Sequence, residues 1–141
     1  MALIRKASAK WEGNLKDGKG HVKFGSFEGA YSFTSRFENG QGSNPEEMIA
    51  AAHASCFSMA LSHGLAEAGF TPRSVSTTAN VTLDKTAAGF KITQIELVTE
   101  ANVPGIDNAK FMEQAEGAKK GCLISQALAA VEIKLSAKLT S

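Results

Sequence analysis

The chain has 141 residues, 43% of them apolar, and its 15 basic and 14 acidic side chains leave a formal net charge of +1. A chain of this length buries about two thirds of its unfolded surface, so we expect one domain, residues 1–141, that needs no disulfide or metal for stability. The near-neutral charge, with lysines and arginines scattered along the chain, argues against a nucleic-acid partner. The two cysteines, Cys56 and Cys122, are too few for a CxxC metal knuckle or a secreted disulfide framework.

The N-terminal ten residues carry charges at Arg5, Lys6 and Lys10 and hold no apolar run of signal-peptide length, so we expect a cytoplasmic protein. The longest weakly polar stretch, 48–60, is too short to cross a bilayer, which needs about 20 residues. The sequence has no phosphate-binding loop, GxGxxG motif or HExxH motif. It therefore predicts no membrane span and argues against nucleotide and classical zinc chemistry, so no cofactor is expected.

The first third of the chain reads as short strands joined by glycine turns. Strands are expected at 8–12, 21–24 and 30–34 and predict an antiparallel meander. A glycine-rich polar segment, 38–44, follows them.

A long helix is expected over 45–68. Asn44 is the N-cap, Pro45 suits the first helical position, and Glu46 and Glu47 suit the positive end of the helix dipole. The middle of this helix has no wide polar face, so we expect it to be buried on more than one side.

Strands alternate again at 75–83 and 91–100, joined by a turn at 84–89. Asp107 is the expected N-cap of a helix at 108–120, and Gly121 separates that helix from a short helical piece at 122–129. A last strand is expected at 130–139. This order predicts an α+β fold with mainly antiparallel sheet.

The cysteines differ in their surroundings. Cys56 lies in an apolar helix, where a free cysteine is most often a small core residue. Cys122 follows Lys119-Lys120-Gly121 and opens a helical turn, where N–H groups and ammonium charge would lower its pKa. The pair also suggests a reversible disulfide, which needs Cα atoms within about 7 Å, a proximity that sequence spacing leaves open.

A reactive thiolate in an apolar site needs a fixed positive neighbour. Arg36 is the best-placed arginine, although a solvated residue at the end of a strand is an equal interpretation. Glu46 and Glu47 are explained by the helix dipole, and either carboxylate is also able to hold a guanidinium. Periodicity favours Glu46, which lies about 80° from Cys56 around the helix axis, whereas Glu47 lies about 180° away. A straight helix separates Glu46 from Cys56 by roughly 15 Å, so Glu46 would act through the arginine.

His53 lies one helical turn before Cys56, and a Cys–His pair is typical of protease-like sites. A hydrogen-bonded structural histidine is the better interpretation, because no oxyanion-hole motif accompanies the pair. His21 and His63 have no metal-type spacing with either cysteine, which argues against zinc.

The segment around Cys56 resembles the NPEEL…AAHAxCFSMAL signature of the osmotically inducible protein C family, OsmC, which is related to the organic hydroperoxide resistance proteins. It reads Asn44-Pro45-Glu46-Glu47-Met48, continues through Ala51-Ala52-His53-Ala54-Ser55-Cys56, and ends Phe57-Ser58-Met59-Ala60. Further matching segments follow the family's order: Lys10-Trp11-Glu12-Gly13, Gly18-Lys19-Gly20, Arg36-Phe37-Glu38-Asn39-Gly40, Glu67-Ala68-Gly69-Phe70-Thr71-Pro72, Val103-Pro104-Gly105-Ile106-Asp107 and Lys119-Lys120-Gly121-Cys122. The resemblance covers essentially the whole chain.

The resemblance implies an OsmC-like fold in which antiparallel sheets wrap around long central helices in an intertwined homodimer. It implies a peroxiredoxin-type enzyme with Cys56 as the peroxidatic and Cys122 as the resolving cysteine. It also implies Arg36 and Glu46 as the residues that hold the thiolate, with Glu47 as the alternative carboxylate. Leu123 departs from the family, which often has proline after the resolving cysteine.

The resulting hypothesis is a thiol-dependent peroxidase that reduces organic hydroperoxides, and hydrogen peroxide less well, through a Cys56 sulfenic acid and a Cys56–Cys122 disulfide. An external dithiol, a small molecule or a lipoylated protein, would reduce the disulfide. The alternative is a non-enzymatic dimer that binds a small molecule or lipid and keeps both cysteines for structure.

Overall fold

We describe the protein from a computed structural model, which describes residues 1–140. The chain forms two compact units, one from Met1 to Met48 and one from Ile49 onward, and each is considered by itself. The expectation of a single domain over residues 1–141 stays a prediction.

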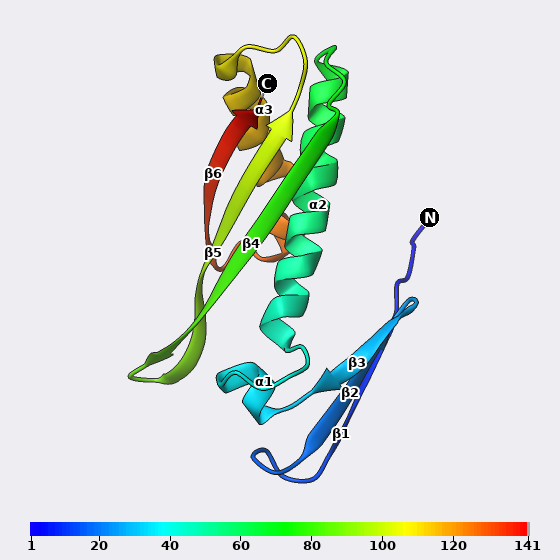
Figure 1. Ribbon diagram of the computed structural model, residues 1–141, viewed down its shortest axis with the longest axis vertical. Helices are drawn as coiled ribbons and strands as arrows, with labels where there is room; N and C mark the ends of the chain where they lie inside the picture. The colour runs from blue at the N-terminus through cyan, green and yellow to red at the C-terminus, as the bar shows by residue number, and fades with distance from the viewer. Residues whose placement is uncertain (141) are drawn as a thin grey trace. The chain divides into compact units, whose positions relative to one another are not determined.

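The first unit contains the expected meander. Strands β1 (Ala7–Glu12), β2 (Lys19–Phe24) and β3 (Phe27–Tyr31) form an antiparallel sheet in the order β1-β2-β3, drawn in blue in Figure 1. Gly25, with φ of 59°, lies in the turn between β2 and β3, which have only two residues between them. On this sheet Trp11 packs against Tyr31, with ring centroids 5.5 Å apart.

A short helix, α1 (Phe33–Phe37), follows β3, so the expectation of a strand through Thr34 was wrong. The reason is a capping box: the Ser35 N–H donates to Ser32 Oγ at 3.1 Å, and the Ser32 N–H donates to Ser35 Oγ at 2.8 Å. These two reciprocal bonds satisfy backbone donors that a helix start leaves open. Arg36 therefore lies on a helix and not at the end of a strand.

The long helix α2 (Pro45–Glu67) confirms the helix expected at 45–68. Its N-cap is Asn44, whose Oδ1 accepts the Glu47 N–H at 2.8 Å. The amide nitrogen of Asn44 donates to the Ser35 carbonyl of α1 at 2.9 Å, so one buried side chain joins the two helices.

The second unit contains a sheet in the order β4-β5-β6, made of β4 (Ser74–Thr86), β5 (Gly89–Asn102) and β6 (Glu132–Thr140). Strands β4 and β5 form an antiparallel hairpin that is longer than expected, because pairing continues to Thr86 and Gly89 and leaves a turn of only two residues. The β5–β6 pair is parallel, whereas the other paired strands of residues 1–140 are antiparallel, which agrees with a mainly antiparallel sheet. A parallel pair needs a long crossover, and helices α3 (Asn108–Gly121) and α4 (Leu123–Ala127) provide it. The α+β class is confirmed.

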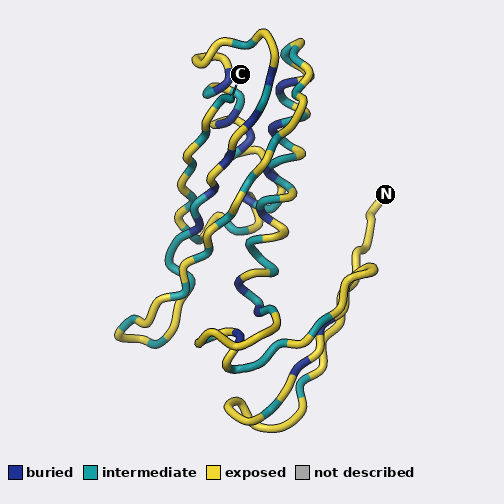
Figure 2. Tube along the Cα trace, in the orientation of Figure 1, coloured by how far each residue is buried: buried dark blue, intermediate teal, exposed yellow. Residues whose placement is uncertain are grey.

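The core of the second unit lies between one face of its sheet and helices α2 and α3. Helix α2 contributes Phe57, Leu61 and Leu65, which pack with Ile95 and Leu97 of β5 and with Phe111 of α3. Figure 2 shows the buried positions recurring along α2 and β5. Within the second unit the opposite side of α2 is open, with Met59 74% exposed, so the expected burial on more than one side is not met by this unit alone.

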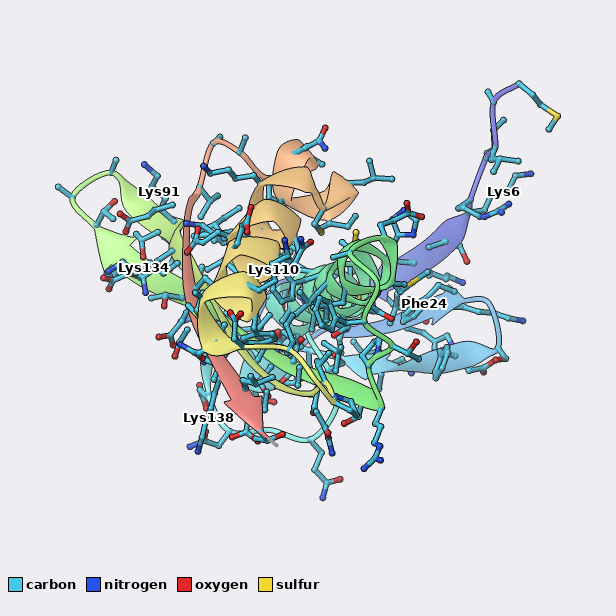
Figure 3. All side chains as sticks on the ribbon, turned by 90° about the horizontal axis from the view of Figure 1, so that it is seen from above. Lys6, Phe24, Lys91, Lys110, Lys134 and Lys138 are labelled. Atoms are coloured by element: carbon cyan, nitrogen blue, oxygen red, sulfur yellow. The ribbon has the colours of Figure 1, made fainter. Side chains whose placement is uncertain are left out.

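Lysines of the second unit are spread over separate elements. Figure 3 labels Lys91 on β5, Lys110 on α3, and Lys134 and Lys138 on β6. The labelled lysines of this unit are thus divided among β5, α3 and β6.

Candidate functional site

The structure brings the two cysteines together. Cys56 lies on α2 and is half-buried, and Cys122 lies between α3 and α4 and is only 1% exposed. Their thiols interact through a side-chain hydrogen bond. Helix α2 therefore presents Cys56 to the junction between α3 and α4, which accounts for a close approach that spacing along the chain could not show.

Hydrogen bonding divides the charge unequally between the two thiols. Burial raises the pKa of Cys56, the hydrogen bond with Cys122 raises it further, and bonds with the backbone of Ile124 and Leu123 lower it only in part. Burial also raises the pKa of Cys122, but hydrogen bonds from Cys56, from the backbone and hydroxyl of Ser125 and from the backbone of Ile124 outweigh it, so its pKa lies below the usual value. The interaction between the two thiols thus favours negative charge on Cys122 and disfavours it on Cys56.

A lowered pKa of Cys122 was expected from nearby N–H groups and ammonium charge, and only the first of these two causes is found. The backbone of the turn that follows Cys122 contributes, as predicted for a cysteine that opens a helix. Ser125 contributes as well, while neither Lys119 nor Lys120 is among the causes.

Arg36 and Glu46 form the second pair of predicted residues, in the first unit. Arg36 Nε donates to Glu46 Oε1 at 2.9 Å, and Arg36 Nη2 donates to Oε2 at 2.8 Å. This hydrogen bonding raises the pKa of the already basic guanidinium further. The Glu46 side chain is 9% exposed, whereas Glu47 is exposed and accepts from Ser43 Oγ at 3.1 Å. The arginine therefore pairs with Glu46 and not with Glu47.

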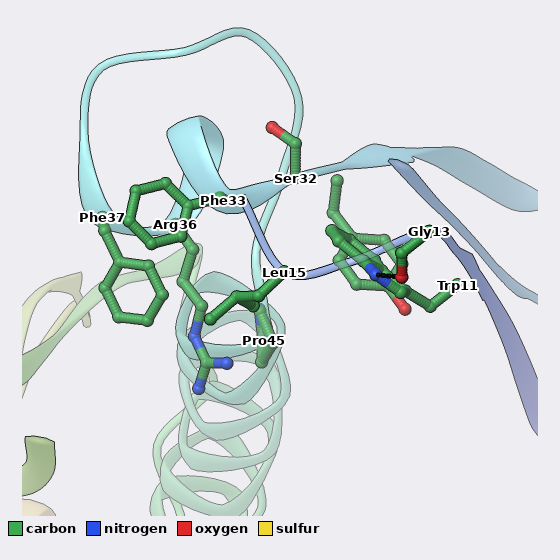
Figure 4. Close-up of a pocket in the computed structure, with 9 residues that line it drawn as sticks. Trp11, Gly13, Leu15, Ser32, Phe33, Arg36, Phe37 and Pro45 are labelled. Atoms are coloured by element: carbon green, nitrogen blue, oxygen red, sulfur yellow. Dashed lines mark hydrogen bonds between the residues drawn. The ribbon is translucent and has the colours of Figure 1, made fainter. Parts of the chain in front are cut away.

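An apolar cavity of about 410 Å³ lies beside Arg36 within the first unit. Its lining includes aromatic and aliphatic side chains: Trp11, Leu15, Tyr31, Phe33, Phe37 and Pro45. Figure 4 shows the Arg36 side chain between Phe37 on one side and Leu15 and Pro45 on the other. The guanidinium carbon lies 5.2 Å from the centroid of the Phe37 ring, which adds a cation–π contact.

A second hollow, of about 680 Å³, lies beside the cysteines in the second unit. Its lining includes Met59 and Ala60 of α2 and Leu123 and Ile124 of α4. Leu123, which replaces the proline often found in the family, is 72% exposed. The side chain at this position borders the hollow and does not fill the core.

His53 has no exposed surface and hydrogen-bonds through Nε2 to Ser125 Oγ at 2.7 Å. The interpretation as a hydrogen-bonded structural histidine is confirmed in that respect. Ser125 was not singled out from the sequence; its only signal is its place three residues after Cys122, in the first turn of the next helix.

Metal sites and membrane spans are the two remaining features that the sequence argued against. No group of three or more histidine, cysteine, aspartate or glutamate side chains among the described residues is arranged to hold a metal ion. No helix within residues 1–140 combines the length and apolar character needed to cross a membrane.

The family model described as OsmC-like protein matches residues 38–136. Over the full length of both chains, the sequence is 53% identical to peroxiredoxin OsmC of Escherichia coli K12 and to the protein of the same name in Shigella flexneri. Among solved structures, an organic hydroperoxide resistance protein of Elizabethkingia anophelis aligns with a TM-score of 0.72 at 25% identity, over 100% of this chain and 99% of that one. An OsmC-like protein of Mycoplasma pneumoniae aligns over the whole of both chains with a TM-score of 0.79 at 14% identity. The chain belongs to the OsmC family.

Proposed function

We propose that this protein is a thiol-dependent peroxidase that reduces organic hydroperoxides, and hydrogen peroxide less well, to alcohols or water. The observation that carries the proposal is the contact between a half-buried thiol, Cys56, and a buried thiol, Cys122, on separate helices. The 53% identity to peroxiredoxin OsmC over the whole length of both chains supports a peroxiredoxin-type enzyme.

In the first step, the Cys56 thiolate attacks the terminal oxygen of the hydroperoxide. An S–O bond forms, the O–O bond breaks, and the alkoxide takes a proton and leaves as the alcohol. Cys56 is oxidised to the sulfenic acid.

In the second step, the Cys122 thiolate attacks the Cys56 sulfur. The S–S bond forms and the S–O bond breaks, and hydroxide leaves and is protonated to water. An external dithiol, a small molecule or a lipoylated protein, then reduces the disulfide by exchange, so the cycle uses no metal, flavin or nicotinamide of the protein's own.

The first step needs a positive charge near Cys56, because burial and the hydrogen bond with Cys122 raise the pKa of the Cys56 thiol. The family resemblance gives this role to Arg36. Glu46 is then a positioning residue, since its two bonds fix the guanidinium.

Apolar surroundings favour organic hydroperoxides over hydrogen peroxide. The cavity beside Arg36 and the hollow beside Cys56 both have mainly apolar linings. An organic group gains free energy by leaving water, about 25 cal/mol for each Å² of apolar surface buried, and hydrogen peroxide has no such group.

The proposal also includes a homodimer of single-domain chains that acts in the cytoplasm, with no nucleic-acid or membrane partner. A thiol–disulfide cycle suits a reducing compartment, where free cysteines persist. The family resemblance supports the dimer.

The test is to add cumene hydroperoxide in stoichiometric amount to the reduced protein and count free thiols. The proposal predicts the loss of both thiols and formation of a Cys56–Cys122 disulfide. If the protein instead binds a small molecule or lipid and its cysteines are structural, both thiols should remain free. The matched control is Cys56→Ser, which should lose turnover altogether; peroxidase activity in that variant would contradict the assignment.

The role of Cys122 is tested separately with Cys122→Ser. This variant should complete one turnover, because Cys56 still reacts with peroxide but has no thiol to resolve it. With excess peroxide, intact-protein mass spectrometry should then show Cys56 oxidised to the sulfinic acid. Sustained turnover by this variant with a dithiol that normally reduces only the disulfide would contradict the resolving role.

A further inference from the structure

His53 and Ser125 form a buried polar contact between α2 and α4. His53 has no exposed surface, Ser125 is 5% exposed, and the 2.7 Å distance between Nε2 and Oγ is that of a good hydrogen bond. A contact of this kind within an apolar core is costly unless its polar atoms are paired.

The contact continues from Ser125 to Cys122. Hydrogen bonds from both the hydroxyl and the backbone of Ser125 are among the causes that lower the pKa of Cys122. His53 of α2, Ser125 of α4 and Cys122, at the junction between α3 and α4, are thus connected in that order.

The direction of the hydrogen bonds follows from the single proton of the serine hydroxyl. A hydroxyl that stabilises the Cys122 thiolate donates its proton to the sulfur. Ser125 Oγ must then accept from His53, so the ring proton of His53 lies on Nε2.

The other ring nitrogen agrees with this assignment. His53 Nδ1 is buried and has no hydrogen-bond partner among the described residues. Burial lowers the pKa of His53, so the ring is neutral at pH 7 and carries one proton, which belongs on the partnered nitrogen. With the proton on Nε2, the unpaired atom Nδ1 is only an acceptor, and the ring has no buried N–H that lacks an acceptor.

We propose that His53 and Ser125 are positioning residues that form a directed relay, His53 Nε2–H to Ser125 Oγ–H to the Cys122 sulfur, which supports negative charge on that sulfur for its attack on the Cys56 sulfenic acid. The second half of this statement rests on the proposed function. The relay itself does not, because it concerns the charge of Cys122 in the reduced protein.

The relay affects the resolving step through two opposing quantities. At a pH below the pKa of Cys122, an increase of that pKa by one lowers the fraction of Cys122 present as thiolate about tenfold. The thiolate that remains is roughly threefold more nucleophilic. If removal of the relay raises the pKa of Cys122 by one, disulfide formation should therefore slow about threefold.

The first experiment measures the pKa of Cys122 in a Cys56→Ser background, from the ultraviolet absorbance of the thiolate as a function of pH. This background removes the one titratable group among the causes that act on Cys122. Ser125→Ala should raise the pKa of Cys122 by about one, because a hydrogen bond to a charged group is lost. Ser125→Thr keeps a hydroxyl and should return the pKa most of the way to its value with serine. An unchanged pKa in Ser125→Ala would overturn the relay.

The second experiment compares His53→Leu with His53→Gln in the same background. Both fill the site, but only glutamine keeps an N–H donor at the position of Nε2. We expect a higher pKa of Cys122 with leucine than with glutamine, and equal values in the two variants would show that His53 only packs. Should the leucine variant fail to fold, the ring ¹⁵N spectrum of His53, assigned by its loss in His53→Gln, decides: a proton on Nε2 supports the relay and one on Nδ1 overturns it.

The kinetic experiment uses the chain with both cysteines. In Ser125→Ala, disulfide formation after one equivalent of cumene hydroperoxide should slow relative to sulfenic acid formation, and excess peroxide should give more Cys56 sulfinic acid. A wild-type chain that forms no disulfide would contradict the proposed function and leave the pKa experiment valid. A normal disulfide rate together with an unchanged pKa in Ser125→Ala would contradict the relay alone.

Discussion

The Arg36–Glu46 pair joins a buried carboxylate to a guanidinium that still reaches the surface, with side-chain exposures of 9% and 37%. Two parallel hydrogen bonds fix the plane of the guanidinium, a geometry that lysine cannot reproduce. Removal of the arginine leaves Glu46 charged and without its partner in a buried place.

We therefore expect Arg36→Ala to lower the free energy of unfolding by about 2 kcal/mol, less than a fully buried pair would lose because Arg36 is partly solvated. Arg36→Lys should cost about half as much, since charge is kept and one bond is lost. Combining Arg36→Ala with Glu46→Gln should recover part of the loss, because the unpaired charge disappears. Urea unfolding measures these values, with exposed Glu47→Gln as the matched control. If the double variant were no more stable than Arg36→Ala, the unpaired carboxylate would not be the cause.

His53 makes stability depend on pH with a definite sign. Burial lowers its pKa in the folded state below the 6.5 of the unfolded chain, so between these values the unfolded chain binds a proton that the folded one does not. The free energy of unfolding should fall as pH drops below 6.5, approaching a slope of about 1.4 kcal/mol per pH unit from this residue.

The measurement is urea unfolding of the wild-type chain and of His53→Gln between pH 7.5 and 5.5, roughly one pH unit on either side of the ordinary histidine pKa. Carboxylates contribute equally to both proteins, so the difference between the two slopes belongs to His53. Parallel slopes would show that His53 titrates normally in the folded protein.

Some contacts of the reactive residues could be predicted from the sequence, and others could not. Periodicity relative to Cys56 favoured Glu46 over Glu47, and the structure shows the arginine pairing with Glu46, ten residues further along the chain. The contact of Cys56 with Cys122 and the hydrogen bond between His53 and Ser125 depend on how α3 and α4 pack onto α2. No pattern along the chain encodes that packing.

Among the secondary-structure elements, α2 is attached to the β4–β5 hairpin by a row of hydroxyls. Thr99 Oγ1 donates to the Ser76 carbonyl at 3.1 Å, so at the 3.0 Å contact between the two threonines Thr77 must donate to Thr99. Ser58 of α2 then donates to Thr77 at 2.8 Å. This row holds the helix face that carries Phe57 against the sheet.

We expect Thr99→Val to cost about 1–2 kcal/mol, because it leaves the Thr77 hydroxyl without an acceptor at a site only 1% exposed. The matched control is Thr78→Val, on the exposed face of β4, which should change stability by less than about 0.5 kcal/mol. Thermal or urea unfolding measures both. Equal stability of the two variants would mean that packing alone attaches the helix.

Elements with strong local signals were the ones that could be predicted. Asn44 and Asp107 cap α2 and α3 as expected, since a cap depends on residues within one turn. Helix α1 was missed although Ser32 and Ser35 form its capping box, because a serine in place of the usual glutamate or glutamine weakens the signal. The sequence left the parallel direction of β6 open, because strand alternation is the same in both directions.

At the scale of the whole molecule, the main open question is what covers the face of α2 that the second unit leaves exposed. The helix has 23 residues, and only the side with Phe57, Leu61 and Leu65 is covered in the second unit. Small or apolar residues occupy much of the other side: Ala51, Ala52, Ser55, Met59 and Ala66 are all exposed. Helices with no wide polar face are usually buried all round, so this surface favours a partner helix.

We expect the chain to be a homodimer in solution through this face, because a two-fold axis lets the same small side chains meet in both directions. Sedimentation equilibrium or light scattering should give twice the chain mass of 14.8 kDa at micromolar concentration. Met59→Glu puts a charge at the centre of the face and should shift the protein toward the monomer by at least tenfold in dissociation constant, since burying an unpaired carboxylate costs well over about 1.4 kcal/mol. Ala109→Glu, at an exposed position of α3, is the matched control and should leave the mass unchanged. A monomeric wild-type chain at these concentrations, or equal masses for the two variants, would show that this face of α2 is not a dimer interface.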